Sequence, residues 1–99
     1  MERFEGIGEA EVERLLEALC SLASVDEARA FLSDLCTPRE IEDLSQRLEV
    51  ATMLAAGSSY LEVSRVTGAS STTVSRVSKC LNRGTGGYRM VLSRLDARR

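Results

Sequence analysis

Apolar residues recur every three or four positions along nearly the whole chain, a spacing typical of amphipathic helices. Alternation of apolar and polar residues between turn signals, the pattern typical of strands, is missing. The chain is 99 residues long, which leaves room for one hydrophobic core. The sequence therefore predicts an all-α fold in a single domain that covers residues 1–99.

Residues that favour helix ends divide this pattern into six segments. The clearest start is Thr37-Pro38-Arg39-Glu40, because proline pre-sets the first helical φ and Glu40 can accept a hydrogen bond from the Thr37 amide. Ser24 and Ser59 each precede a glutamate by three residues, which is the form of a capping box, and Gly68 suits a left-handed helix end. The predicted helices occupy residues 9–23, 25–35, 38–57, 59–68, 71–84 and 87–97.

The residue types that are missing narrow the chemistry. The chain has no histidine, the commonest general base and metal ligand. Its three cysteines, Cys20, Cys36 and Cys80, form no CxxC pair, so neither a disulfide framework nor a metal knuckle is indicated. We therefore expect no enzyme, no metal and no cofactor. Met1–Glu5 is acidic where a signal peptide is basic, and no apolar run reaches the roughly 18 residues of a membrane span, so we expect a cytoplasmic protein without a membrane partner.

Charge is distributed unevenly along the chain. Residues 1–49 hold 5 Arg against 13 Asp or Glu, a net charge of −8, whereas residues 50–99 hold 8 Arg or Lys against 2 Asp or Glu, a net charge of +6. Between Val63 and Arg94 there is no Asp or Glu at all. An ordinary solvated surface usually mixes both signs. The pattern favours one surface that faces a polyanion and another that is turned away from it.

The basic half contains the pattern of a helix-turn-helix. Two short helices flank Thr67-Gly68-Ala69-Ser70, where Gly68 can supply the positive φ of the turn and Ser64 is a small residue in the preceding helix. A small core is expected to form from Val63, Val66, Ala69, Val74 and Val77. The opposite face of the second helix carries short hydroxyls and cations, namely Ser71, Thr72, Ser75, Arg76 and Lys79, which suit phosphate oxygens and base edges in a major groove. The alternative is an ordinary pair of helices whose serines are caps and whose arginines are solvated.

The residues expected to bind DNA have two roles. Hydroxyls approach base edges, directly or through water, while cations meet phosphates, and Arg76 could do either. The full expected set is Arg65, Ser70, Ser71, Thr72, Ser75, Arg76, Lys79 and Arg83. Arg94, Arg98 and Arg99 near the end of the chain are either further phosphate contacts or a soluble, frayed end.

Residues 35–83 resemble the trp repressor superfamily, most specifically at Thr37-Pro38-Arg39-Glu40, at Gln46-Arg47-Leu48 and in the run from Thr67 to Arg76. The continuation Gly87-Tyr88-Arg89-Met90-Val91-Leu92 resembles the YerC/YecD-like branch of that superfamily. The resemblance implies an intertwined all-helical homodimer whose core is formed by the helices of residues 1–57. It also implies that a helix-turn-helix at residues 59–83 of each subunit enters successive major grooves, about 34 Å apart.

The resemblance also bears on a small-molecule effector. In the tryptophan-responsive member, two arginines sandwich the indole and a threonine forms part of the pocket wall; they match Arg47, Arg76 and Thr73. A glycine and a serine of that pocket are replaced here by Val77 and Cys80. Overpacking a tight apolar site costs about 1–3 kcal/mol, so we expect no response to tryptophan. Val77 is expected to fill the core, and the spacing of Cys80 from Val77 favours a buried thiol over a redox switch.

The function predicted from these patterns is a sequence-specific DNA-binding transcriptional regulator, a repressor, which acts as a homodimer on double-stranded DNA. The alternative is a helical dimer without DNA affinity that holds another protein through its acidic half. Paired carboxylates such as Glu42 and Asp43 are interpreted as solvated helix charges rather than as catalytic groups.

Overall fold

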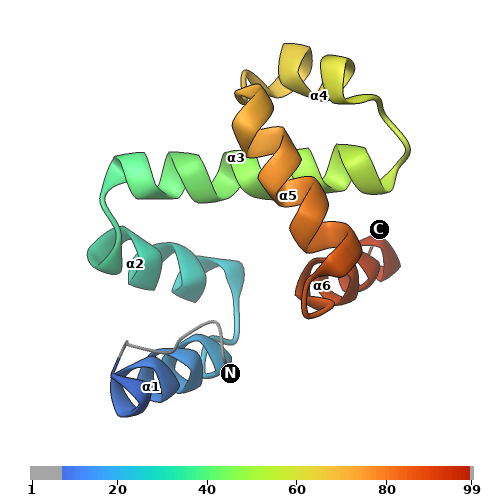
Figure 1. The fold of residues 1–99 in the computed structure, drawn as a ribbon. Coiled ribbons are helices and arrows are strands. Elements are labelled where there is room, and N and C mark those ends of the chain that lie inside the picture. Colours follow the sequence, from blue (N-terminus) through green and yellow to red (C-terminus); the bar gives the residue numbers. More distant parts are fainter. Residues whose placement is uncertain (1–7, 99) are drawn as a thin grey trace. The chain divides into compact units, whose positions relative to one another are not determined.

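The computed structural model describes residues 8–98, which form six α-helices and no strand (Figure 1). This confirms the all-α prediction. The interpretations of Met1–Glu5 and of Arg99 concern residues outside the described range. The helices are α1 (Glu9–Cys20), α2 (Val25–Leu35), α3 (Pro38–Ala55), α4 (Tyr60–Thr67), α5 (Ser71–Arg83) and α6 (Gly87–Ala97). None of these helices is long and apolar enough to cross a membrane.

The helix ends show how local hydrogen bonds set the boundaries. α1 ends at Cys20, three residues before the predicted end, because the Ser21 hydroxyl donates to the carbonyl oxygen of Ala18 at 2.6 Å. At the start of α2, the Ser24 hydroxyl accepts from the Glu27 amide at 3.1 Å. The Glu27 carboxylate accepts from the Ala23 amide rather than from Ser24, at 2.9 Å. The second cap is therefore formed one residue earlier than the capping-box pattern predicts.

The chain divides into two compact units, one up to Pro38 and the other from Arg39 onward. In the first unit, α1 and α2 bury none of their residues. Their apolar stripes remain open, with Leu15 and Leu19 each 39% exposed and Leu35 52% exposed. Two helices with an uncovered apolar stripe lack the burial that normally stabilises helices of 11 and 12 residues.

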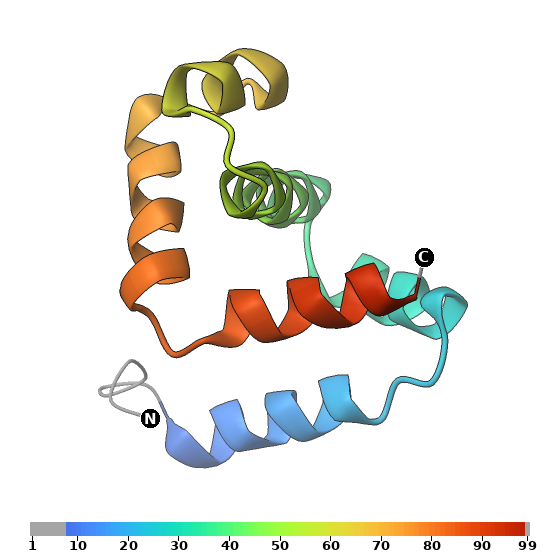
Figure 2. The ribbon, with the colours of Figure 1, turned by 90° about the vertical axis from the view of Figure 1, so that its right-hand side faces the viewer.

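The second unit has its own core, to which α3, α4, α5 and α6 all contribute. In Figure 2, α3 is seen nearly end-on, with α4 and α6 on opposite sides of it and α5 spanning between them. The buried cluster consists of Val50, Ala51, Val63, Ala69, Val74, Val77, Leu81 and Leu92. The side chains are small and branched, so the helices can approach closely without an aromatic residue at the centre.

One prediction about this core was wrong. Val66 is 53% exposed, because α4 turns Val63 toward the cluster and Val66 away from it. In α3, Val50 and Ala51 are fully buried in the cluster, whereas Leu44 and Leu48 are 44% and 37% exposed. α3 is apolar on two adjacent faces, and the second unit uses only one of them.

A short connection from 84 to 86 joins α5 to α6. The amide of Gly84 donates to the carbonyl oxygen of Cys80 at 3.0 Å and closes the last turn of α5. A Cβ atom at position 84 would collide with that same carbonyl oxygen. The tight connection therefore requires glycine at this position, because backbone atoms cannot move aside as a flexible side chain could.

Candidate nucleic-acid interface

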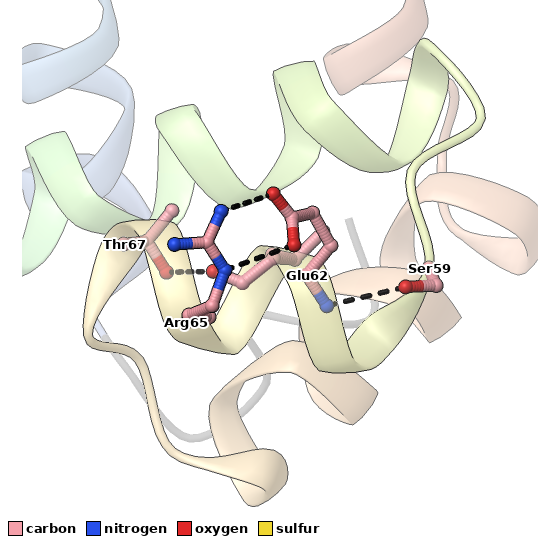
Figure 3. Close-up of polar contacts among 5 residues, drawn as sticks. Ser59, Glu62, Arg65 and Thr67 are labelled. Carbon is pink, nitrogen blue, oxygen red and sulfur yellow. Dashed lines mark hydrogen bonds and ion pairs between the residues drawn. The ribbon is translucent and has the colours of Figure 1, made fainter.

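α4 and α5, with the turn 68–70 between them, are called here the α4–α5 pair. The Ser59 hydroxyl begins α4 by accepting from the Glu62 amide at 3.2 Å (Figure 3). Gly68 ends it with φ of 75°, the left-handed conformation expected from the sequence. Ser70 then begins α5 by accepting from the Thr73 amide at 3.1 Å. The serine and glycine residues therefore set both helix ends that bound the turn.

Side chains on both sides hold the turn in place. The Ser64 hydroxyl donates to the carbonyl oxygen of Ala69. The Thr67 hydroxyl accepts from the Ala69 amide at 3.1 Å and donates to the Val63 carbonyl oxygen at 2.7 Å. From α3, the Gln46 amide group donates to the Thr67 carbonyl oxygen at 3.3 Å. The turn is thus braced from within the pair and from the neighbouring long helix.

α5 presents a polar face to solvent. At 3.6 residues per turn, its exposed members fall within one arc of about 140° around the helix. They include no acidic residue, and we call this set the exposed face of α5: Ser71, Thr72, Ser75, Arg76, Lys79, Asn82 and Arg83. The buried side of the same helix carries Val74, Val77 and Leu81. The structure therefore brings together most of the residues that the sequence predicts to bind DNA.

Arg65 does not belong to the exposed face of α5: it lies on α4 and binds a carboxylate of its own helix. Its guanidinium donates from Nε to the Glu62 carboxylate at 3.0 Å and forms a second bond from Nη2 (Figure 3). The hydrogen bonds from Arg65 lower the pKa of Glu62, so the carboxylate stays ionised. Both partners are exposed to solvent, where such a pair contributes little to stability. The main effect is that part of the Arg65 charge is already neutralised within α4.

The residues matched to an effector pocket are distributed over two helices. Arg47 is exposed on α3, Arg76 is exposed on α5, and Thr73 is half-buried on α5. Val77 is only 2% exposed and belongs to the buried cluster, which confirms its expected role as core filler. Cys80 is half-buried, less enclosed than the sequence predicts.

Sequence reasoning missed a polar chain that connects three helices. Tyr60 on α4 donates through its hydroxyl to Ser78 on α5, and Asn82 on α5 contacts both Ser78 and Arg89 of α6. The one signal in the sequence is the spacing of Ser78 and Asn82, which places them one turn apart on α5. A periodicity search for apolar residues does not detect such a signal.

These features define a small all-helical protein in which a pair of short helices, joined by a tight turn, carries a basic face. The chain matches the family model described as Trp repressor protein over residues 10–96. The protein therefore belongs to the Trp repressor family.

Three relatives illustrate its similarity to known proteins. The chain is 46% identical over 85 residues to the uncharacterized protein YerC of Bacillus subtilis, an alignment that covers 86% of this chain and 82% of the relative. A TrpR-like protein from Eubacterium eligens has a solved structure with a TM-score of 0.85 and 47% identity, covering 91% of this chain and 93% of that one. A candidate Trp repressor from Staphylococcus aureus has a TM-score of 0.87 and 39% identity, covering 94% of this chain and 93% of that one.

These similarities support the YerC-like branch predicted from the sequence, and with it the six-helix Trp-repressor-like fold.

Proposed function

We propose that this protein is a cytoplasmic homodimeric transcriptional repressor, without cofactor, that binds specific sites on double-stranded DNA through a helix-turn-helix formed by α4 and α5. The observation that carries the proposal is the exposed face of α5, where three hydroxyls and three cations share one side without an acidic neighbour. Hydroxyls of this length can reach base edges in the major groove, and the cations can bind phosphates on either side of it. Membership of the Trp repressor family supports this assignment.

Residues of the α4–α5 pair divide between reading bases and holding the backbone. Ser71, Thr72 and Ser75 approach base edges, while Lys79 and Arg83, further along α5, bind phosphates. Arg76 lies between the two groups. Ser70 is engaged as the helix cap, and its backbone rather than its hydroxyl faces the phosphate. Arg65 joins the phosphate contacts when the Glu62 carboxylate releases it.

A second copy of the chain is the proposed cover for the first unit. Leu15 and Leu19 of α1 and Leu35 of α2 are exposed in the first unit. In the second unit, Leu44 and Leu48 of α3 are exposed as well. Joined in a symmetric pair, these surfaces would form one core and present two α5 helices about 34 Å apart, one turn of B-DNA. The acidic residues of the N-terminal half would then lie on the side turned away from DNA.

A salt titration tests the proposal directly. Fluorescence anisotropy with a 30-base-pair duplex is expected to show a logarithm of affinity that falls linearly with the logarithm of salt, with a slope of roughly −5 to −7. That slope corresponds to three or four cations from each of two protomers. Sedimentation of the complex should give two chains per duplex. Absence of duplex binding at 50 mM salt would favour the alternative, a helical module that binds another protein.

Replacing Ser71 and Thr72 together with alanine is expected to relax base preference. On a duplex selected by the wild-type protein from a random pool, the double variant should bind at least about thirtyfold more weakly, since two lost polar contacts together contribute about 2 kcal/mol or more of discrimination. On random duplex, its affinity should stay within about twofold, because both residues are uncharged. The measurement is the ratio of the two affinities. Equal losses on both duplexes would contradict a specifying role.

Isothermal titration with millimolar tryptophan is expected to show no saturable heat. The Val77 side chain fills the core where the family resemblance places the indole, and it is 2% exposed. Room for the ligand would have to come from displacing packed side chains, at about 1–3 kcal/mol. DNA affinity measured with and without tryptophan should therefore coincide. Saturable binding at this concentration would show that Val77 does not close the pocket.

A further inference from the structure

Among the described residues, 8–98, Ser78 on α5 is the one polar residue that is buried, with 7% of its surface exposed. A buried hydroxyl is costly unless its hydrogen bonds are made. The Ser78 oxygen accepts from the Tyr60 hydroxyl of α4 and from the Asn82 amide nitrogen at 3.3 Å. The same amide nitrogen donates to the Ser78 carbonyl oxygen at 2.9 Å. The centre of α5 is thus tied to α4 through a polar contact rather than through packing alone.

Arg89 of α6 fixes the other end of this chain. Its Nη2 donates to the Asn82 carboxamide oxygen at 3.0 Å, and its Nε donates to the Leu81 carbonyl oxygen at 3.2 Å. The Leu81 carbonyl belongs to the last turn of α5, where backbone oxygens have no partner within the helix. Arg89 therefore binds the C-terminal end of α5 and one of its side chains with the same guanidinium.

The orientation of the Asn82 side-chain amide is determined by its two neighbours. Arginine can only donate, so the Asn82 oxygen must face Arg89 and the Asn82 nitrogen must face Ser78. Turning the Asn82 amide around would place two donors against each other at Arg89. Arg89 thereby selects the orientation of the Asn82 amide and directs its nitrogen to Ser78, which the packing of valine and leucine side chains does not do.

We propose that Arg89, Asn82 and Tyr60 are positioning residues that set the orientation of α5 relative to α4 and α6, and so determine how well the exposed face of α5 fits a particular DNA sequence. This inference rests on the proposed DNA-binding function. Arg89 is one of the cations of the basic half of the chain, and its guanidinium is engaged by α5. Arg89 acts on DNA through α5, not by direct contact.

The test uses Arg89→Lys, which keeps the charge but cannot supply two nitrogens in the planar fork of a guanidinium. Its matched control is Arg39→Lys, the same change at an exposed arginine of α3 that is assigned no contact with DNA. We expect Arg89→Lys to bind a duplex selected by the wild-type protein about tenfold more weakly, with unchanged affinity and salt slope on random duplex. The control should leave both affinities unchanged.

Tyr60→Phe provides a second variant, because it removes only the hydroxyl from a half-exposed ring. It should lower the ratio of selected-site to random-site affinity about threefold. An unchanged ratio in both Arg89→Lys and Tyr60→Phe would overturn the proposal. Equal losses of Arg89→Lys on selected and random duplex, with a smaller salt slope, would also overturn it, because Arg89 would then be a phosphate contact.

A readout without DNA separates this inference from the proposed function. Amide hydrogen exchange in the last turn of α5 should be at least fivefold faster in Arg89→Lys than in Arg39→Lys, since the carbonyl of Leu81 loses its donor. Unchanged exchange contradicts the positioning role. Faster exchange in a protein whose wild type selects no DNA sequence would support the network while refuting the proposed function.

Discussion

Replacement of Lys79 and Arg83 together by alanine is expected to weaken duplex binding about a thousandfold at 0.1 M salt. Both side chains lie on the exposed face of α5, and a dimer would lose four phosphate contacts at once. Each contact contributes about 0.9 to the slope of log affinity against log salt, so the slope should become less steep by about 3 to 4. Anisotropy titrations between 50 and 300 mM salt measure both quantities.

The matched control removes two cations from elsewhere in the same chain. Arg29 on α2 and Arg39 at the start of α3 are exposed and lie beside Asp26 and Asp43, at 2.9 and 3.7 Å respectively. The double variant Arg29→Ala with Arg39→Ala should leave the salt slope unchanged. Equal loss in both double variants would mean that net charge alone governs the affinity, and the assignment to α5 would fail.

Val77→Gly is expected to lower the free energy of unfolding by about 2.5–4 kcal/mol. Loss of a fully buried valine accounts for about 1.5–3 kcal/mol of this, and glycine in a helix interior adds about 1 kcal/mol. For a domain of this size the melting temperature should fall by roughly 15–25 °C. Thermal unfolding followed by circular dichroism measures the shift.

Val66→Gly is the control for this prediction, because it makes the same chemical change at a position of α4 that is 53% exposed. It retains the helix-propensity cost but removes little buried area, so about 1 kcal/mol is expected. A similar loss in both variants would show that Val77 does not contribute to the core as its burial indicates.

Local signals in the sequence predicted the helix ends well. Ser59 and Gly68 act through hydrogen bonds and backbone angles that involve only their immediate neighbours, so their positions suffice to predict α4 and the turn. For the start of α5 the sequence offers Ser70 or Ser71 as cap, and the structure uses Ser70. The exception at Glu62 is instructive. Its carboxylate could return to the cap, but Arg65 one turn later offers two charged donors and binds it instead.

The contacts between helices were harder to predict than the helix ends. Periodicity identifies an apolar face but not which neighbour covers it, and this is why Val66 was placed in the core and Val50 was not. The contact between Tyr60 and Ser78 joins residues 18 positions apart, and nothing in either residue's neighbourhood indicates the other. The exposed face of α5 was predictable because a single helix carries it. The bonds that orient that helix were not, since they depend on three helices at once.

Gly84 has a consequence for the evolution of this family. Any amino acid with a side chain at this position would force the final turn of α5 to unwind or would redirect the chain into α6. Homologous proteins with a different residue at the equivalent site are thus expected to diverge in the path of their last helix, even where every earlier helix superimposes. A comparison of such homologues would show whether a substitution at this position changes only the path of the last helix, or changes the binding preference of the protein as well.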